Sequence, residues 1–530
     1  MTKNTIVLLA ALALLPSLHS MQADSATWNA DPTSKDWNTA ANWTPQTVPM
    51  ERTDVATFDV SSVTNVLLSG AATIDSIVFT ASARAFTINV GKDLTFVGAG
   101  VVNDSSAVQT LVGTSRSIIA FKRTSSAGHT MIDSIGPIFS DSATAGNSTL
   151  ITRGFATFIG SATAGQATIM STPNGLGSLG TYFMETSSAG TSNILCDGAN
   201  IAGSSVVGSV TFYQDSSADH SIVNCFGGSA EGGYGARAFF TGNSTAAEAV
   251  LIATGGTNGG LGGTLLFWDD STGAEARVEL FDTGILNVLN HNPPGITVGS
   301  IEGDGTVVLG KNNLTVGSND LATVFSGDIR DGTTRAGGSL TMTGAGTLTL
   351  TGPSSYTGGT IIEGLGTLFV NNRLGSGTGT GAVQANSGSL GGGGIIAGAV
   401  TIGTGASGGA TLAPGQSKRK QGVLNIQNTL TLNADATYAW KIDSNKADGA
   451  KVIVSGAVII SAANFSPVEL RSGSIALGKV FTIIDNTSAS PINGTFANLP
   501  DGGTVTIGLN DFQANYEGGD GNDLTLAVVP

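Results

Sequence analysis

The sequence has few charged residues, few aromatic residues and almost no cysteine. Charged residues make up 12% and aromatic residues 6% of the 530 residues, and there are two cysteines. Typical globular domains contain about 25% charged residues, so an ordinary globular surface rich in lysine and glutamate is excluded. Two cysteines also exclude a fold stapled by many disulfides. Beyond the first residues, no apolar run reaches the ~18 residues that a membrane-spanning helix needs.

Glycine and small polar residues take the place of charge. The chain has 76 glycines and is 40% hydrophobic, which is enough apolar material for a folded core with little helix. Its net charge is -15, and such a surface repels nucleic acid and anionic membranes. The one basic cluster, at 418–420, lies in a Gly/Ser/Gln-rich loop and is interpreted as an exposed turn.

The first 23 residues have the pattern of a secretion signal. Lys3 is followed by an apolar run from Ile6 to Leu15, and Pro16 ends this run. Such a run is too short to span a bilayer. We expect cleavage after Ser20 or Ala23, and no integral membrane segment thereafter.

A sequence phrase recurs seven times between residues 121 and 283. Each copy begins with Phe, has Ser or Thr five residues later, Ala or Gly six residues later, and an aliphatic residue eleven residues later. The phenylalanines are Phe121, Phe139, Phe158, Phe183, Phe212, Phe240 and Phe267. Repeats of 18 to 29 residues indicate a solenoid, in which each coil buries its apolar side against its neighbours.

The phrase predicts two strands and a corner in each coil. We expect the Phe and the aliphatic residue to point inward from successive strands, with the small and hydroxylated residues between them at the corner. Small side chains are required there because equivalent corners would lie about 4.8 Å apart. The insertions after each aliphatic residue vary in length, and we expect specificity to reside in them.

The two cysteines occupy equivalent positions in consecutive copies. Cys196 and Cys225 each lie thirteen residues after a repeat Phe. Stacked coils would place their backbones at a separation that a disulfide accepts. The sequence therefore predicts a bridge between neighbouring coils, with two buried free thiols as the alternative.

Three of the five tryptophans lie close together near the N-terminus. Trp28, Trp37 and Trp43 are interpreted as part of an N-terminal cap over residues 24–60, because the first coil of a solenoid must be covered. The alternative is that these rings, or Trp268 at the end of the array, stack on sugar rings.

The remaining chain divides at a proline-rich segment, His291-Asn292-Pro293-Pro294-Gly295. Two prolines cannot join a central strand ladder. We therefore expect a first solenoid region over 61–290, which contains the array, and a second over 291–530. Both regions consist of short alternating strands separated by Gly-rich turns.

The segment Gly346 to Thr360, followed by Gly366-Thr367-Leu368, resembles the passenger-associated transport repeat, also called the autotransporter-associated β-strand repeat, over about 340–370. The resemblance implies an all-β, right-handed parallel β-helix on or released from a bacterial envelope. Typical relatives also carry a C-terminal membrane barrel, which needs many further strands of ~10 residues. The chain ends at Pro530, so we expect no such barrel.

No catalytic or metal-binding motif stands out in the sequence. Glu248 and Glu275 occupy one column of the array, beside His220, and could form a carboxylate pair. The column varies from copy to copy, and we therefore favour a solvated corner that tolerates any polar residue. A second column, ending Asp215, Asn243 and Asp270, could hold calcium or form corner hydrogen bonds. Residues 518–523 resemble a single calcium-binding nonapeptide and are interpreted as a turn. We expect no catalytic residues, metals or cofactors.

These observations predict an exported structural or adhesive β-helix protein, secreted or held at the cell surface, that is not an enzyme. Its expected partner is extracellular polysaccharide or the cell-envelope surface, and not nucleic acid. The alternatives are a glycan-binding module that uses Trp28, Trp37, Trp43 or Trp268, and a polysaccharide-active β-helix enzyme. The 23 Lys and Arg residues are few for the basic patch that such an enzyme would need.

Overall fold

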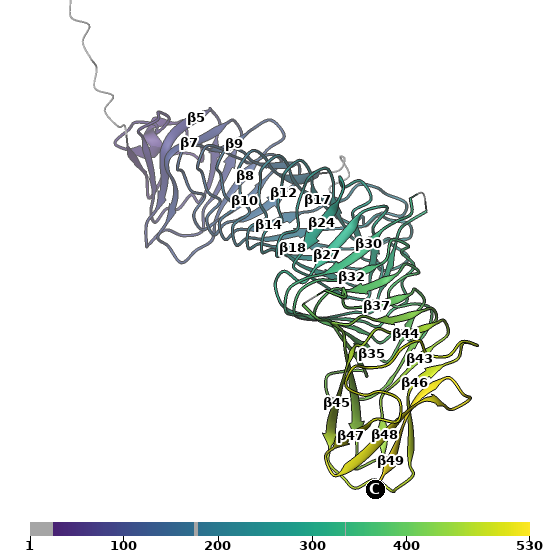
Figure 1. The fold of residues 1–530 in the computed structure, drawn as a ribbon. Helices are drawn as coiled ribbons and strands as arrows, with labels where there is room; N and C mark the ends of the chain where they lie inside the picture. Colours follow the sequence, from purple (N-terminus) through teal and green to yellow (C-terminus); the bar gives the residue numbers. More distant parts are fainter. Residues whose placement is uncertain (1–24, 174–178, 334, 407) are drawn as a thin grey trace, which may run out of the picture.

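The computed structural model describes residues 25–173, 179–333, 335–406 and 408–530. The chain forms a parallel β-solenoid of about 17 turns, which confirms the expected all-β architecture. The coils stack into an elongated, curved body that runs from the purple N-terminal end to the yellow C-terminal end (Figure 1). The expected secretion signal lies outside the described residues. In the part that is described, the one helical element is the 3-10 turn η1 (Ala40–Asn42), and no helix has the length and hydropathy that a membrane crossing requires.

Fifteen strands, contributed by successive coils, form the first sheet. In spatial order, they are β2 (Trp43–Thr44), β1 (Ala26–Trp28), β3 (Val55–Phe58), β5 (Ala72–Phe79), β7 (Leu94–Asn103), β9 (Ile119–Phe121), β11 (Ile138–Phe139), β13 (Phe155–Phe158), β15 (Leu179–Phe183), β17 (Gly208–Phe212), β19 (Arg237–Phe240), β21 (Thr264–Phe267), β23 (Ile285–Asn287), β26 (Thr306–Val308) and β29 (Asp328–Arg330). All neighbours pair in parallel except β1 and β2, which pair antiparallel.

The second sheet takes the alternate strand of each coil and follows most of the stack. Its parallel strands are β4 (Asn65–Leu68), β6 (Thr87–Val90), β8 (Gln109–Gly113), β10 (Thr130–Ser134), β12 (Thr149–Thr152), β14 (Thr168–Ser171), β16 (Asn193–Cys196), β18 (Ile222–Cys225), β20 (Val250–Ala253), β22 (Arg277–Leu280), β25 (Ser300–Gly303), β28 (Ala322–Phe325), β31 (Thr347–Leu350), β33 (Thr367–Val370), β35 (Ser389–Gly392), β38 (Thr411–Pro414), β41 (Thr437–Asp443) and β45 (Asn464–Arg471). A short strand, β42 (Asp448–Gly449), pairs antiparallel with β41.

A third sheet begins at Gly295, directly after the two prolines. Its strands are β24 (Gly295–Val298), β27 (Asn313–Val316), β30 (Ser339–Met342), β32 (Thr360–Ile362), β34 (Val383–Ala385), β37 (Val400–Ile402), β40 (Leu430–Leu432) and β44 (Val458–Ile460). The fourth sheet contains β36 (Ile395–Ile396), β39 (Val423–Ile426), β43 (Lys451–Val454), β46 (Val480–Asn486), β49 (Asp523–Val529), β48 (Asn510–Gly518) and β47 (Thr504–Ile507). The early coils have a turn between their two strands, at the corner. In the later coils, the third sheet adds a strand on that side of the solenoid.

The repeated Phe and aliphatic residues form two continuous ladders in the core, as the sequence predicts. All seven phenylalanines are 0% exposed, and rings of consecutive coils stack with centroids 4.6 to 4.9 Å apart. The aliphatic residues from Ile132 to Val278 pair in register along the second sheet. The Phe ladder also extends one coil further, to Phe96, whose ring lies 4.7 Å from that of Phe121.

The hydroxylated residue of the phrase shapes the corner. In every copy its side-chain oxygen accepts a hydrogen bond from the backbone N–H two residues later, at 2.8 to 3.1 Å. The residue that donates this bond has a positive φ in all seven copies. These residues are Gly128, Gly146, Gly165, Gly190, Asp219, Ala247 and Ala274. The corner is therefore a side-chain-stabilised turn, which explains why Ser or Thr is always present.

The antiparallel strands β46 to β49 close the C-terminal end of the solenoid. The ring of Trp440 is fully buried, with the rings of Phe481 and Phe512 at 5.8 and 6.1 Å. Its indole N–H donates to the carbonyl of Ala450 at 2.7 Å. Aromatic side chains therefore cover the last parallel coils at this end of the core. The turn expected at 518–523 lies between β48 and β49.

Candidate functional site

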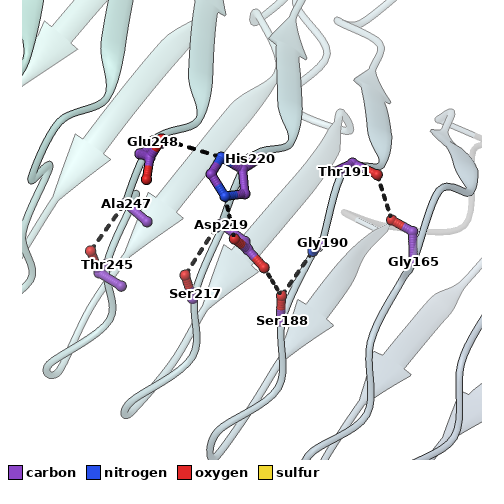
Figure 2. A network of polar contacts seen from close by, with 10 residues as sticks. All are labelled: Gly165, Ser188, Gly190, Thr191, Ser217, Asp219, His220, Thr245, Ala247 and Glu248. Carbon is purple, nitrogen blue, oxygen red and sulfur yellow. Dashed lines mark hydrogen bonds and ion pairs between the residues drawn. The ribbon is translucent and has the colours of Figure 1, made fainter. Parts of the chain in front are cut away.

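The corner column of the array brings together His220, Glu248 and Asp219 (Figure 2). His220 Nδ1 lies 3.4 Å from a Glu248 carboxylate oxygen, and its Nε2 lies 3.5 Å from one of Asp219. Ser188 donates to the other Asp219 oxygen at 2.9 Å and accepts from the N–H of Gly190 at 2.8 Å. The sequence identified His220 and Glu248 as neighbours but did not include Asp219, which lies one position earlier in its coil.

This network lacks the geometry of an activated nucleophile. The Ser188 hydroxyl bonds to a carboxylate and to the backbone, whereas activation requires a hydrogen bond to the imidazole. The side chains of His220, Glu248 and Asp219 are 54%, 61% and 41% exposed, so water screens their charges. Glu275 is also exposed and lies on the next coil. The column is best described as a solvated corner network.

The column considered for calcium forms hydrogen bonds between coils. Asn243 Nδ2 donates to Asp215 at 3.1 Å, and Asn292 Nδ2 donates to Asp270 at 3.1 Å. Across the described ranges, no group of three or more His, Cys, Asp or Glu side chains is placed to hold a metal ion.

The N-terminal tryptophans are buried against one another. Trp28, Trp37 and Trp43 are 1%, 0% and 0% exposed. Their indole N–H groups donate to the carbonyls of Val63, Pro49 and Trp37, respectively, at 3.1, 2.9 and 2.6 Å. Their rings thus present no face to a sugar, and the interpretation of this region as a cap stays a prediction. Of the four tryptophans considered for glycan contact, only Trp268 retains partial exposure.

Cys196 and Cys225 are directly paired across adjacent parallel strands. Both side chains are fully buried and are free thiols in this structure. A hydrogen bond with Cys225, together with burial, raises the pKa of the Cys196 thiol well above its usual value. The register is the one that the sequence predicts, and the bridge itself stays a prediction.

Two of the insertions after the aliphatic anchors stack on one another, at 226–236 and 254–263. Backbone N–H groups of Gly228 and Gly232 donate to the carbonyls of Leu261 and Gly259, respectively, at 2.8 and 2.9 Å. Glycine permits this close approach, because a Cβ at Gly260 would collide with the backbone of Gly228. The two insertions therefore form one layered projection beside the first sheet.

A groove of about 540 Å³ lies between this projection and the outer face of the first sheet. The insertions contribute Tyr234 and Leu261, which are 41% and 47% exposed. The sheet contributes Arg237 and Phe239 from β19, and Trp268 follows β21. The rings of Phe239 and Trp268 meet edge to face, 5.5 Å apart. The remaining lining residues are Gly235, Gly260, Gly262, Thr264, Leu266, Thr283 and Ile285.

The groove continues an aromatic strip along the outside of the solenoid. Five consecutive strands, β13 to β21 of the first sheet, bear or immediately precede an outward-facing aromatic residue. These residues are Phe155, Tyr182, Tyr213, Phe239 and Trp268. Centroid distances are 5.6 Å between the first two rings and 6.1 Å between the second and third. Burial, and secondarily the nearby Tyr213, raises the pKa of the Tyr182 hydroxyl.

Arg237 is the one charged residue among those lining the groove. Its guanidinium lies over the Tyr234 ring, 5.5 Å from the centroid. Elsewhere on the stack, Arg153 is paired with Asp133 at 2.6 Å, and Arg330 is paired with Asp328 at 3.5 Å. For Arg237, no carboxylate lies within 4.0 Å in the part of the chain that is described. The groove therefore combines aromatic faces with a cation held against a ring.

Sequence reasoning identified Trp268 and the insertions, but not Tyr234, Arg237 or Phe239. A signal for Phe239 was present, because it precedes a repeat Phe as Tyr182 does, and both therefore face outward. Tyr234 lies in an insertion whose length differs from copy to copy. Its position relative to the sheet therefore could not be derived from the repeat.

A second hollow, of about 680 Å³, lies beside β26 and β29 and is lined by Arg330 and Arg335, among others. Its lining includes Thr333 and Arg335, and residue 334 between them in the sequence lies outside the described residues. It lacks aromatic side chains, and Arg330 is already paired with Asp328. The groove beside β19 and β21 is therefore the better-defined candidate for a binding surface.

Comparison with known families supports the sequence resemblance. Residues 340–368 match the passenger-associated-transport-repeat model. In the fold, this match covers β30, β31 and β32 and the start of β33, and Tyr356 within it is fully buried. The repeat and the β-solenoid are consistent with an autotransporter passenger domain and point to a secreted or cell-surface protein. Comparison with curated proteins gives no match.

Proposed function

We propose that this protein is an exported, non-catalytic structural and adhesive scaffold that acts at the cell surface or after secretion. The passenger-associated repeat supports export. The groove and the aromatic strip on the outer face carry the adhesive part of the proposal, because apolar rings in a concave surface are typical of binding sites. Extracellular polysaccharide is the partner class that these features suit best.

The absence of catalysis is supported by the exposed corner network. Catalytic acids and bases normally lie in a site that excludes water. Glu248 and His220 are more than half exposed. Their column also varies along the array, where it holds His, Asn, Gln, Thr and Glu in different coils.

Binding and cleavage should be measured together on the purified chain. Affinity electrophoresis in gels containing individual extracellular polysaccharides is expected to show retardation by at least one polymer, with no increase in reducing ends. New reducing ends that disappear in Glu248→Gln, but persist in the matched exposed variant Glu185→Gln, would instead establish the polysaccharide-active enzyme.

Export is tested separately. Antibody against the folded chain is expected to label intact producing cells or to detect the protein in their medium. Retention of the whole population inside the cytoplasm would contradict the proposal.

A further inference from the structure

The geometry points to an acidic glycan, in which sugar rings carry carboxylates, as the ligand of the groove beside β19 and β21. This inference rests on the proposed function and specifies its ligand class. Pyranose rings have apolar C–H faces that pack on aromatic rings, and the groove offers Tyr234, Phe239 and Trp268 for such contacts. Its lining contains no acidic side chain, so a carboxylate that enters meets no like charge there.

Arg237 supplies the charge complement. A guanidinium binds a carboxylate through two parallel N–H···O bonds, a geometry that an ammonium cannot reproduce. Packing over Tyr234 holds the guanidinium at the groove, which lowers the entropy lost when a ligand orders it. The chain as a whole has a net charge of -15, which repels polyanions. An arginine without a carboxylate partner among the described residues therefore marks the place where an anionic ligand is locally favoured.

The aromatic strip extends the site along the stack. Ring contacts join Phe155, Tyr182 and Tyr213, and a second contact joins Phe239 and Trp268, so the aromatic rings of five consecutive coils extend the surface beyond the groove itself. Such an extended surface accommodates a polymer better than a monosaccharide. Longer oligosaccharides are therefore expected to bind more tightly than short ones, until the strip is covered.

Intrinsic fluorescence can report on this site selectively. Four of the five tryptophans, Trp28, Trp37, Trp43 and Trp440, are 0–1% exposed, and Trp268 lines the groove. The probe is an oligogalacturonate of defined length, and its methyl ester serves as the uncharged control with the same sugar rings. The acid is expected to change the fluorescence, and to bind about tenfold or more tightly than the ester at low salt.

Two variants separate charge from stacking. Arg237→Gln is expected to weaken binding of the acid about tenfold or more and to leave binding of the ester unchanged. Tyr234→Ala, at an exposed position, is expected to weaken both. Arg153→Gln is the matched control, because Arg153 also lies on the outside of the array but is already paired with Asp133. Arg153→Gln is expected to bind both probes as tightly as the unmodified chain. Hydrogen exchange of the backbone amides should be native in all three variants, which shows that each of them is folded.

Equal affinity for acid and ester, or an unaffected Arg237→Gln variant, would overturn the acidic-glycan inference. Absence of binding to either probe would overturn it as well, while the proposed scaffold would stand if another polysaccharide retarded the chain. Mass spectrometry of the same samples monitors the length of the oligogalacturonate. Its shortening would instead overturn the non-catalytic function.

Discussion

Two residues in each coil of the array have a left-handed backbone conformation, and their side chains vary from copy to copy. The second of these positions is Gly in the first four copies, then Asp219, Ala247 and Ala274. A Cβ in this conformation costs roughly 1–2 kcal/mol, and glycine avoids this cost. At this second position, the last two copies of the array therefore contain local strain that the first four do not.

Replacing Ala247 with Gly is expected to stabilise its coil by up to about 1 kcal/mol, after allowance for the greater chain entropy of glycine. Native-state hydrogen exchange of the amides in this coil should become slower. Ala246→Gly is the control, because it removes a fully buried methyl group from the neighbouring residue and should make exchange faster. Faster exchange in Ala247→Gly would show that the positive φ is not a source of strain.

The cysteine pair gives a second prediction at this scale. After export, an extracellular oxidant is expected to take two electrons and two protons from Cys196 and Cys225, forming one S–S bond between coils. The exported protein should resist alkylation in denaturant until it is reduced. A Cys225→Ser variant should expose one alkylatable thiol without reduction. Two alkylated thiols in the unreduced exported protein would exclude the bridge.

At the scale of elements, the third sheet begins beside the one copy of the phrase that has glycine instead of alanine at its sixth position. The sixth position of the phrase is Ala in six copies and Gly273 in the last. A Cβ at Gly273 would lie 2.5 Å from Val298 Cγ1 and 2.6 Å from the Thr297 carbonyl oxygen. Strand β24 therefore packs directly on this corner, and only glycine leaves room for it.

Gly273→Ala is expected to destabilise the junction between the array and the three-sided coils by about 1–3 kcal/mol, the usual cost of overpacking. Exchange should increase in β24 and β27 and should change little in coils far toward the N-terminus, because solenoid coils contact mainly their neighbours. Ala189→Gly, at the same position three copies earlier, should leave β24 protected. Normal protection of β24 in Gly273→Ala would contradict this account.

On the scale of the whole molecule, the stack depends on what covers its ends. At the C-terminal end, the antiparallel strands β46 to β49 and the neighbouring rings enclose Tyr438 and Trp440. A parallel stack without such a cover presents open strand edges and core side chains to solvent.

A chain truncated after Ala463 is therefore expected to expose Tyr438 and Trp440 and to self-associate. Light scattering should show larger particles than for the full chain at equal concentration, and a hydrophobic dye should bind. The full chain carrying Trp440→Phe serves as the control, since it alters the same core while retaining the cover. A monomeric truncated chain that binds no dye would show that β45 to β49 are not needed to close the solenoid.

Much of the fold could be predicted because a parallel stack forces equivalent residues into contact. Once the seven phenylalanines are aligned, the inward ladders and the pairing of Cys196 with Cys225 follow from spacing alone. The turn at each corner was harder to predict, since it depends on a hydrogen bond that the backbone N–H seven residues after each Phe donates to the Ser or Thr hydroxyl, and the residue that donates it varies. Phe96 was missed because the rest of its coil does not repeat the phrase.

The sequence by itself determined an all-β solenoid, the inward residues of each coil and the passenger-associated repeat, because these depend on periodicity and local spacing. Only the tertiary structure decided which polar and aromatic residues form a usable surface. Tyr234 lies in an insertion whose path is set by backbone contacts with the next coil, and that path places its ring beneath the guanidinium of Arg237. Trp28, Trp37 and Trp43, in contrast, are enclosed by their own packing. Exposure of this kind depends on contacts between coils, which repeat spacing does not specify.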